Sequence, residues 1–354
     1  MGKIYDAVVV GSGPAATAFL CSVSDELKIA VISKKNSRKV CGGLLSSSAI
    51  RELNNMGLSV PEDVRVSPEV QVIRTMDLSD GRTCYYPRDY VNVDREKFDS
   101  WLLSLSEGKY DFFEGTCIGF EKFGENYCVK FLDSYGEKSL VCRSIIGGDG
   151  ANSVIRRNIS AEKNRKDMYT AIQQWYDAYE CKGHDGKNAF SCIFDGSVSD
   201  SYAWTFTKDD KIAFGGAYPK QHSRERFESE KKNLEKYGIT FGKPISTEAC
   251  TVVFGKNTQK FLFGVKGERV YLTGEAAGLI SPSSLEGISS ALKSGYELGK
   301  LFIPERSVLP EYTKKLCMLR LKLRLKRFKS FVLCSPFLRF LVMKSGITAK
   351  KIDK

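Results

Sequence analysis

Residues 6–20 read DAVVVGSGPAATAFL, an apolar run followed by a glycine turn and a stretch of small residues. The apolar run predicts a buried parallel strand, and the small residues after the turn predict a helix. Gly11 permits the sharp turn, Gly13 lets the backbone approach a pyrophosphate, and Ala16 lets the helix pack closely on the strand. The free N–H groups at the start of this helix would point at the phosphates. The candidate phosphate-binding residues are Gly11, Gly13, Pro14, Ala15 and Ala16.

Length and composition limit the class of protein. The chain has 354 residues, 42% apolar and 27% charged, as expected for a folded protein with one large or two interleaved domains. The first motif begins too close to the N-terminus for a signal peptide, and no stretch of about 18 apolar residues follows, so we expect a cytoplasmic protein. Eleven scattered cysteines without a Cys-x-x-Cys pair argue against a disulfide framework, a zinc site or an iron–sulfur cluster. We therefore expect no metal.

The net charge of +12 is concentrated near the C-terminus. Residues 312–354 hold thirteen Lys and Arg and one acid, whereas residues 1–311 hold 41 basic and 41 acidic residues. A nucleic-acid groove across the body is therefore not expected, and the basic tail predicts a surface contact of its own.

The second strand of the nucleotide fold is predicted at residues 28–33. In this fold an acid commonly follows the strand and holds the adenosine ribose, but here Ser33 occupies that position and precedes Lys34 and Lys35. Serine can still bond a ribose hydroxyl, and the lysines would suit a 2′-phosphate. We favour a weakened adenosine contact, with Ser33 and Lys34 at the ribose.

Three glycine-rich segments together resemble one superfamily of flavoproteins. They are G-x-G-x-x-A at residues 11–16, GGDGANSVIR at residues 147–156, and GEAAG…P…EGI at residues 274–288. Their order and spacing resemble the FAD-dependent superfamily that includes para-hydroxybenzoate hydroxylase, flavin halogenases and geranylgeranyl reductases. A match to all three is far more specific than a match to one.

Further segments resemble the geranylgeranyl reductase family more narrowly. They are KVCGG at residues 39–43, YAWTF at residues 202–206, and the expected capped helix at residues 92–102, which contains Arg95. The chain departs from the family pattern at three positions, which are Ser33 for an acid, Glu275 for an aspartate and Thr207 for a proline.

The resemblance implies an α/β fold with a Rossmann-like FAD-binding domain interleaved with an antiparallel-sheet substrate domain, followed by C-terminal helices. The predicted FAD-binding segments are residues 1–70, 90–160 and 255–302. The predicted substrate segments are residues 71–89 and 161–254, and residues 303–354 form the tail.

The resemblance also implies the remaining residues around FAD. They are Cys41, Gly42, Gly43, Arg95, Asp149, Gly150, Gly274, Glu275, Gly287 and Ile288. Asp149 and Glu275 follow buried strands, so each can accept from a ribityl hydroxyl. The alternatives are a turn aspartate that caps the next helix and an N-cap acid. The helix that starts near Gly287 would direct its positive end at the N1–C2=O edge of reduced flavin.

Cys41, Tyr202 and Trp204 are the candidate catalytic residues. The Cys41 thiol, beside the flavin ring in the resemblance, could donate the proton that completes a double-bond reduction, or could be a packed core residue. Tyr202, Trp204 and Phe206 alternate along a strand and share one face. That face could line a channel for a long apolar substrate, or belong to an ordinary sheet core.

The basic tail predicts an amphipathic helix with two apolar stripes. One stripe contains Tyr312, Leu316, Leu319 and Leu323, and the nearly opposite one contains Leu321, Leu325, Phe328 and Val332. A helix of this kind suits packing on the body by one side and on lipid by the other, through residues 312–343. The alternative is a tail that covers the body and solvates its own charges.

We therefore expect an FAD-dependent oxidoreductase of the geranylgeranyl reductase type. It would transfer hydride from reduced flavin to a carbon–carbon double bond of an isoprenoid or other lipid-like molecule, at a membrane face. Electrons would come from NAD(P)H or ferredoxin, the latter an electron-donor protein. A flavin monooxygenase or halogenase on the same fold, and a non-catalytic flavin electron-transfer protein, are the alternatives.

Overall fold

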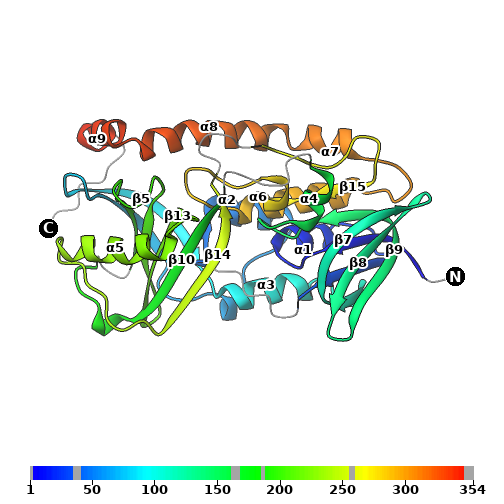
Figure 1. The fold of residues 1–354 in the computed structure, drawn as a ribbon, viewed down its shortest axis with the longest axis horizontal. Helices are drawn as coiled ribbons and strands as arrows, with labels where there is room; N and C mark the ends of the chain where they lie inside the picture. Colours follow the sequence, from blue (N-terminus) through cyan, green and yellow to red (C-terminus); the bar gives the residue numbers. More distant parts are fainter. Residues whose placement is uncertain (1–2, 35–40, 161–167, 185–187, 255–259, 347–354) are drawn as a thin grey trace.

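The computed structural model describes residues 3–34, 41–160, 168–184, 188–254 and 260–346. Two sheets occupy the two ends of an elongated molecule, and the C-terminal helices run along one of its long sides (Figure 1). The chain passes between the sheets several times. The predicted α/β architecture, with interleaved parts and C-terminal helices, is confirmed.

The first sheet is the expected nucleotide-binding sheet. Its strand order is β6-β2-β1-β9-β8-β7, and β15 also pairs with β9. β1 pairs in parallel with β2 and β9, whereas β7, β8 and β9 form an antiparallel run. The parallel centre is buried, which explains its unbroken apolar runs. The strands are β1 (Ile4–Val10), β2 (Ile29–Ser33), β6 (Tyr110–Glu114), β7 (Thr116–Phe123), β8 (Asn126–Asp133), β9 (Gly136–Gly147) and β15 (Val270–Leu272).

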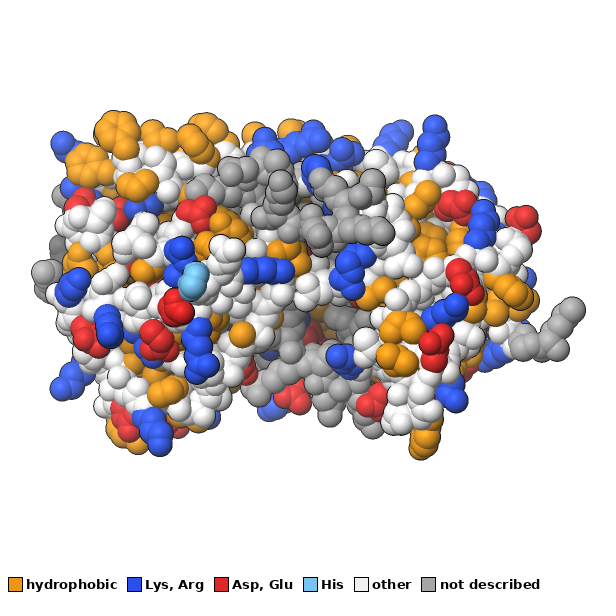
Figure 2. Space-filling view, viewed as in Figure 1, with side chains coloured by type: hydrophobic (Ala, Val, Ile, Leu, Met, Phe, Trp, Pro, Cys, Tyr) orange, Lys and Arg blue, Asp and Glu red, His pale blue; other side chains and the backbone are white. Residues whose placement is uncertain are grey.

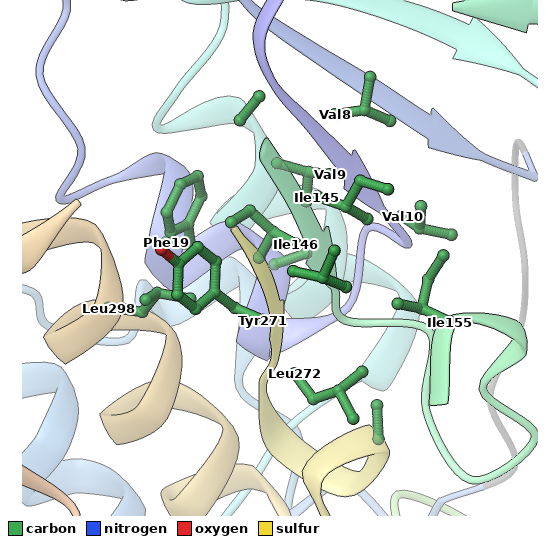
Figure 3. Close-up of a cluster of buried hydrophobic side chains, with 14 of the residues drawn as sticks. Val8, Val9, Val10, Phe19, Ile145, Ile146, Ile155, Tyr271, Leu272 and Leu298 are labelled. Atoms are coloured by element: carbon green, nitrogen blue, oxygen red, sulfur yellow. The ribbon is translucent and has the colours of Figure 1, made fainter. Parts of the chain in front are cut away.

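Helices α1 (Pro14–Leu20) and α6 (Ile288–Leu301) cross with their backbones very close together. A Cβ added to Gly295 would lie 2.0 Å from the carbonyl oxygen of Ala15, so only glycine fits there. The two helices complete the core beneath the parallel strands, where Phe19 of α1 and Leu298 of α6 lie near Tyr271 of β15 (Figure 3).

The second sheet has the order β14-β10-β13-β12-β11-β4-β5-β3. Most of its pairs are antiparallel, but β4 and β11 pair in parallel, so the expectation of an antiparallel sheet holds only in part. This pair joins two distant segments, and no local pattern specifies its direction. The strands are β3 (Leu44–Ser46), β4 (Val70–Asp77), β5 (Arg82–Asn92), β10 (Met168–Asp177), β11 (Ala189–Phe194), β12 (Ala203–Lys208), β13 (Lys211–Pro219) and β14 (Ser246–Val253).

Shorter helices connect and cover the two sheets. Helix α5 packs on β13 through Phe227, whose ring lies 5.1 Å from that of Phe214. Helix α3 is the expected capped helix, since the Asp94 carboxylate accepts from the backbone N–H groups of residues 96 and 97. The connecting elements are α2 (Ser47–Asn55), α3 (Arg95–Ser104), α4 (Val154–Ile159), α5 (Ser223–Glu235), and the 3₁₀ turns η1 (Glu62–Val64), η2 (Ala178–Glu180) and η3 (Gly274–Ala277).

The tail forms helices α7 (Leu309–Lys315), α8 (Cys317–Cys334) and α9 (Pro336–Ser345), as predicted, and its last eight positions lie outside the described residues. The first predicted stripe, from Tyr312 to Leu323, is buried against the body. In the second stripe Val332 is half-buried, and the members that lie exposed are Leu321, Leu325 and Phe328. Within the described residues, no helix is long and apolar enough to cross a membrane.

Candidate active site

The glycine turn after β1 lies against the segment that follows β9. Gly11 has a φ of +100°, and a Cβ there would lie 2.7 Å from the carbonyl oxygen of Gly148. Gly13 is the N-cap of α1 and offers no side-chain cap. Nothing lies within 4 Å of a Cβ built on Gly13 or on Gly150, so both glycines border open space. A phosphate at this end of α1 would meet N–H groups that no capping side chain covers.

The surroundings of Asp149 suit both roles that the sequence allows, a cap for the next helix and a contact with a ligand hydroxyl. Its Oδ2 accepts from the backbone N–H groups of Val154 (2.7 Å) and Ile155 (3.3 Å), so it caps α4. Its Oδ1 is buried and has no hydrogen-bond partner among the described residues. Burial raises the pKa of the Asp149 carboxyl, although the hydrogen bonds it accepts oppose this shift. An unpartnered buried carboxylate oxygen beside the glycine turn is suited to accept from a hydroxyl of a bound ligand.

The third glycine segment meets the first. Gly274 has a φ of +57°, and a Cβ there would lie 2.9 Å from the Cβ of Ala15. The turns after β1, β9 and β15 therefore converge at one edge of the sheet. Gly287 is the N-cap of α6, with Ile288 as its first residue and no side-chain cap.

Two of the expected cofactor contacts have protein partners. The Glu275 carboxylate accepts from the backbone N–H of Val253 through Oε1 (3.2 Å), which ties it to the end of β14. Ser33 Oγ and Ser12 Oγ are hydrogen-bonded at 2.9 Å, so the serine in the ribose position binds the glycine turn itself. Lys34 is exposed beside it, and Lys35 lies outside the described residues. The ribityl and ribose contacts of Glu275 and Ser33 stay predictions.

The Cys41 loop lies beside two cations. Arg95 is fixed by a bidentate ion pair with Asp99, with distances of 3.1 and 3.0 Å, and it also hydrogen-bonds the Cys41 thiol. Burial acts to lower the pKa of Arg95, but Cys41 and Asp99 together raise it. Lys208 is the second cation, and burial lowers its pKa while Cys41 opposes the shift.

Lys208 also holds the loop in place. Its Nζ donates to the carbonyl oxygens of Gly42 (3.1 Å) and Val93 (2.8 Å). Gly43 has a φ of +70°, and a Cβ on Gly42 would lie 3.0 Å from the Phe206 ring. The loop is therefore pressed between the start of α3 and the aromatic strand, which explains its paired glycines.

The aromatic side chains at residues 202–206 do share one face, and each has an identified contact. The Tyr202 hydroxyl donates to the carbonyl oxygen of Ser284 (2.7 Å), and the Trp204 indole N–H donates to Gln173 Oε1 (3.0 Å). Phe206 is buried, with its ring 5.9 Å from that of Trp175. Tyr202 and Phe206 thus belong to a sheet core, whereas Trp204 remains half-buried. Burial raises the pKa of Tyr202 well above its ordinary value.

Residues 281–287 lie between the glycine turns and the aromatic face. Ser284 accepts from Tyr202, Glu286 accepts from Ser46 Oγ, and Gly287 caps α6. The two predicted clusters, one for the cofactor and one for the substrate, are thus joined by a single loop.

Sequence reasoning missed Lys208 and Gln173. Alternation places Lys208 on the same face as Tyr202, Trp204 and Phe206, so the strand pattern held a signal for it. Gln173 is opposite Gly215 in register, and Gly215 is opposite Trp204, a pairing that only the folded sheet reveals.

No family model matches the chain. Protein CbrA of Shigella flexneri serotype 5b (strain 8401) is 35% identical over 352 residues, covering 97% of this chain and 94% of that protein.

Two solved structures show the same fold. A geranylgeranyl bacteriochlorophyll reductase-like protein (Ta0516) from Thermoplasma acidophilum has a TM-score of 0.74 at 20% identity, covering 94% of this chain and 87% of that one. A variant of Klebsiella pneumoniae HpxO complexed with FAD has a TM-score of 0.68 at 14% identity, covering 96% and 93%. This chain therefore belongs to the CbrA family, and its fold is that of the FAD-dependent oxidoreductases.

Proposed function

We propose that this protein binds FAD and reduces a carbon–carbon double bond of an isoprenoid or other lipid-like substrate. The observation that carries the proposal is the hydrogen bond of Arg95 to the Cys41 thiol, in a loop that Lys208 holds by its backbone and that packs against the aromatic strand. One loop connects that strand with the edge at which three glycine turns converge.

The described residues fit FAD. The open space at Gly13 and the uncapped start of α1 suit a pyrophosphate, and the unpartnered Oδ1 of Asp149 suits a ribityl hydroxyl. The N-terminus of α6 at Gly287 and Ile288 would stabilise negative charge on the ring. When bound, FAD supplies the hydride for the reduction.

Cys41 is the proposed proton source. The hydride adds to one carbon of the double bond, and the proton held on Cys41 Sγ adds to the other, so the substrate gains two hydrogen atoms. Arg95, fixed by Asp99, orients the sulfur through its hydrogen bond. Lys208 is a positioning residue, because it holds the loop through two backbone carbonyls rather than touching the substrate.

The aromatic face favours an apolar substrate. Trp204 is half-buried next to the fully buried Phe206, so apolar surface remains available to a long chain. Tyr202 donates its hydrogen bond within the protein, so its role here is to shape the pocket. NAD(P)H or a ferredoxin-type partner protein would return electrons to the enzyme.

An anaerobic assay tests the proposal. The protein is loaded with FAD, photoreduced, and mixed with a detergent-dispersed geranylgeranyl lipid. We expect flavin absorbance to return and the lipid to gain two hydrogen atoms by mass spectrometry. Oxygen insertion on admission of air would instead indicate the monooxygenase alternative. Lack of reaction with every alkene tested would favour an electron-transfer protein, and a protein that cannot take up FAD would contradict all of these functions.

The role of Cys41 has its own test. We expect Cys41→Ser, once fully loaded with FAD, to slow the reoxidation of photoreduced flavin by the lipid at least about 100-fold, as for loss of a general acid. Cys128→Ser changes a half-buried cysteine of the first sheet and serves as the control. If both variants react at the same rate, Cys41 is not the proton donor.

A further inference from the structure

The outer side of α8 and α9 carries a row of exposed apolar side chains. Phe328 is 71% exposed, Phe337 69% and Leu325 65%, which is unusual for residues of their size. Apolar side chains gather along the upper edge in Figure 2, over the place of α8 and α9, with Lys and Arg among them. The exposed apolar residues of this surface, which we call the α8–α9 face, are Met318, Leu321, Leu325, Phe328, Phe331, Phe337, Leu341 and Val342.

The inner side of the same helices fixes this orientation. Leu319 and Leu323 are buried against the body, and Ser330 Oγ donates to the carbonyl oxygen of Pro282 (2.8 Å). Arg339 of α9 forms a buried ion pair with Asp77 of β4. Because each helix is anchored by its inner side, the α8–α9 face cannot turn into the core without breaking these contacts.

The charged side chains that α8 and α9 themselves contribute have a single sign. Residues 312–346 contain ten Lys and Arg and no acid. Arg339 is neutralised by Asp77, and the Arg320 guanidinium lies 5.6 Å from the centroid of the Phe263 ring. The cations on the rest of α8 that flank the apolar row are Lys322, Arg324, Lys326, Arg327 and Lys329.

We propose that the α8–α9 face docks on an anionic lipid bilayer. Apolar side chains would enter the boundary between headgroups and acyl chains, and the flanking cations would meet the lipid phosphates. A second copy of this chain fits poorly, since the two faces would bring like charges together without an acid to compensate. Helices α8 and α9, which carry the row, run along one long side of the molecule, and this suits contact with a flat lipid surface (Figure 1).

Docking in this orientation would place the candidate active site near the lipid. Ser330 of α8 contacts Pro282, and the same loop accepts the hydrogen bond of Tyr202 through Ser284. A lipid substrate could then pass from the bilayer beside α8 to the aromatic face. This consequence rests on the proposed function, whereas docking itself does not.

Vesicle co-sedimentation of the full chain, loaded with FAD, tests docking. We expect binding to vesicles of phosphatidylcholine and phosphatidylglycerol that weakens with salt, and little binding to phosphatidylcholine alone. The double substitution Leu325→Glu with Phe328→Glu should weaken binding at least tenfold. As a control, Phe123→Glu with Tyr135→Glu alters two exposed aromatics on the first sheet, which are 60% and 89% exposed, and should leave binding unchanged.

Charge is tested separately. Arg324→Gln with Arg327→Gln should weaken binding to the anionic vesicles several-fold, whereas Lys138→Gln with Lys182→Gln should not, although all four residues are exposed. Circular dichroism checks that each variant is folded. Wild-type binding by the Leu325 and Phe328 variant would overturn the proposal. The proposal would also be overturned if sedimentation showed a concentration-dependent dimer of the wild type that the Leu325 and Phe328 variant abolishes. Neither result bears on alkene reduction in detergent, so the two proposals can fail independently.

Discussion

At the scale of single residues, Asp149 carries the sharpest expectation. Its Oδ2 caps α4, and its buried Oδ1 faces no partner among the described residues. In Asp149→Asn the amide oxygen can keep the cap, but a donor then replaces the acceptor at the Oδ1 position. We expect the Kd for FAD to rise about tenfold, roughly 1.4 kcal/mol, measured by quenching of flavin fluorescence on titration of the apoprotein.

Asp195→Asn is the matched control for this substitution. Asp195 is a buried aspartate just after β11 that accepts from the Ser197 N–H (3.0 Å) and from Asn233 Nδ2 (2.7 Å). Its substitution should affect thermal stability but leave FAD affinity at the wild-type value. If Asp149→Asn binds FAD as tightly as wild type, Asp149 is only a helix cap.

Single residues also show how far the sequence could predict the site. The tight turn at Gly11 and the helix cap at Asp149 could be predicted, because a strand–turn–helix unit dictates its own glycines and caps locally, whereas their contacts with FAD stay predictions. The contact of Glu275 with Val253 and the role of Lys208 in the Cys41 loop were not found. Both join segments far apart in the chain, so their partners depend on the tertiary fold.

At the scale of elements, the crossing of α1 and α6 sets the geometry of the glycine turns. A Cβ on Gly295 would lie 2.0 Å from the Ala15 carbonyl oxygen, and a Cβ on Gly274 would lie 2.9 Å from the Cβ of Ala15. In Gly295→Ala the helices must separate, so we expect a loss of about 1–3 kcal/mol in unfolding free energy together with weaker FAD binding. Chemical denaturation and flavin titration measure the two effects.

Gly196→Ala provides the comparison for Gly295→Ala. Nothing lies within 4 Å of a Cβ at Gly196, and its φ is not in the left-handed region, so alanine fits there. We expect a change below about 0.5 kcal/mol and no change in FAD affinity. A Gly295→Ala protein as stable as Gly196→Ala would show that α6 can shift without cost.

The tail helices show which element properties are local. Residues 319–326 hold leucine and cations without a β-branched residue, a composition that favours a helix, and α8 extends over Cys317–Cys334. The division into an inner and an outer stripe also follows from helical spacing. The parallel pairing of β4 with β11 is not a local property, because the direction of a strand in a sheet depends on how the chain crosses between distant segments.

At the scale of the whole molecule, the tail connects the two sheets. Helix α7 packs on the first sheet, where the Tyr312 hydroxyl donates to the carbonyl oxygen of Leu272 (3.1 Å). Helix α9 reaches the second sheet, where Cys84 Sγ of β5 donates to the carbonyl oxygen of Met343 (3.5 Å). Helix α8 spans the distance between them (Figure 1). The relative position of the two sheets therefore depends on the contacts that α7 and α9 make at the two ends of the tail.

The ion pair of Arg339 with Asp77 holds helix α9 on the second sheet. Arg339 Nε and Asp77 Oδ2 lie 2.6 Å apart, and both side chains are almost fully buried. Removing one partner leaves a buried charge without compensation, so we expect Arg339→Met to lose about 3–5 kcal/mol of unfolding free energy. The double variant Asp77→Leu with Arg339→Met should recover much of this loss. Arg306→Met, which removes an exposed ion pair with Glu311, should cost less than about 1 kcal/mol.

The pH dependence of the unfolding free energy lost in Arg339→Met identifies the cause of that loss. Burial opposes ionisation of Asp77, but the hydrogen bonds from Arg339 and Ser79 hold its pKa below the ordinary value of 3.8. A carboxyl with a depressed pKa contributes stability above its unfolded pKa and loses it as the pH falls through the folded one. The difference between wild type and Arg339→Met should therefore be largest near pH 7 and shrink below about pH 4, as measured by urea denaturation across that range. A difference that stays constant with pH would assign the loss to packing of the Arg339 side chain instead of its charge.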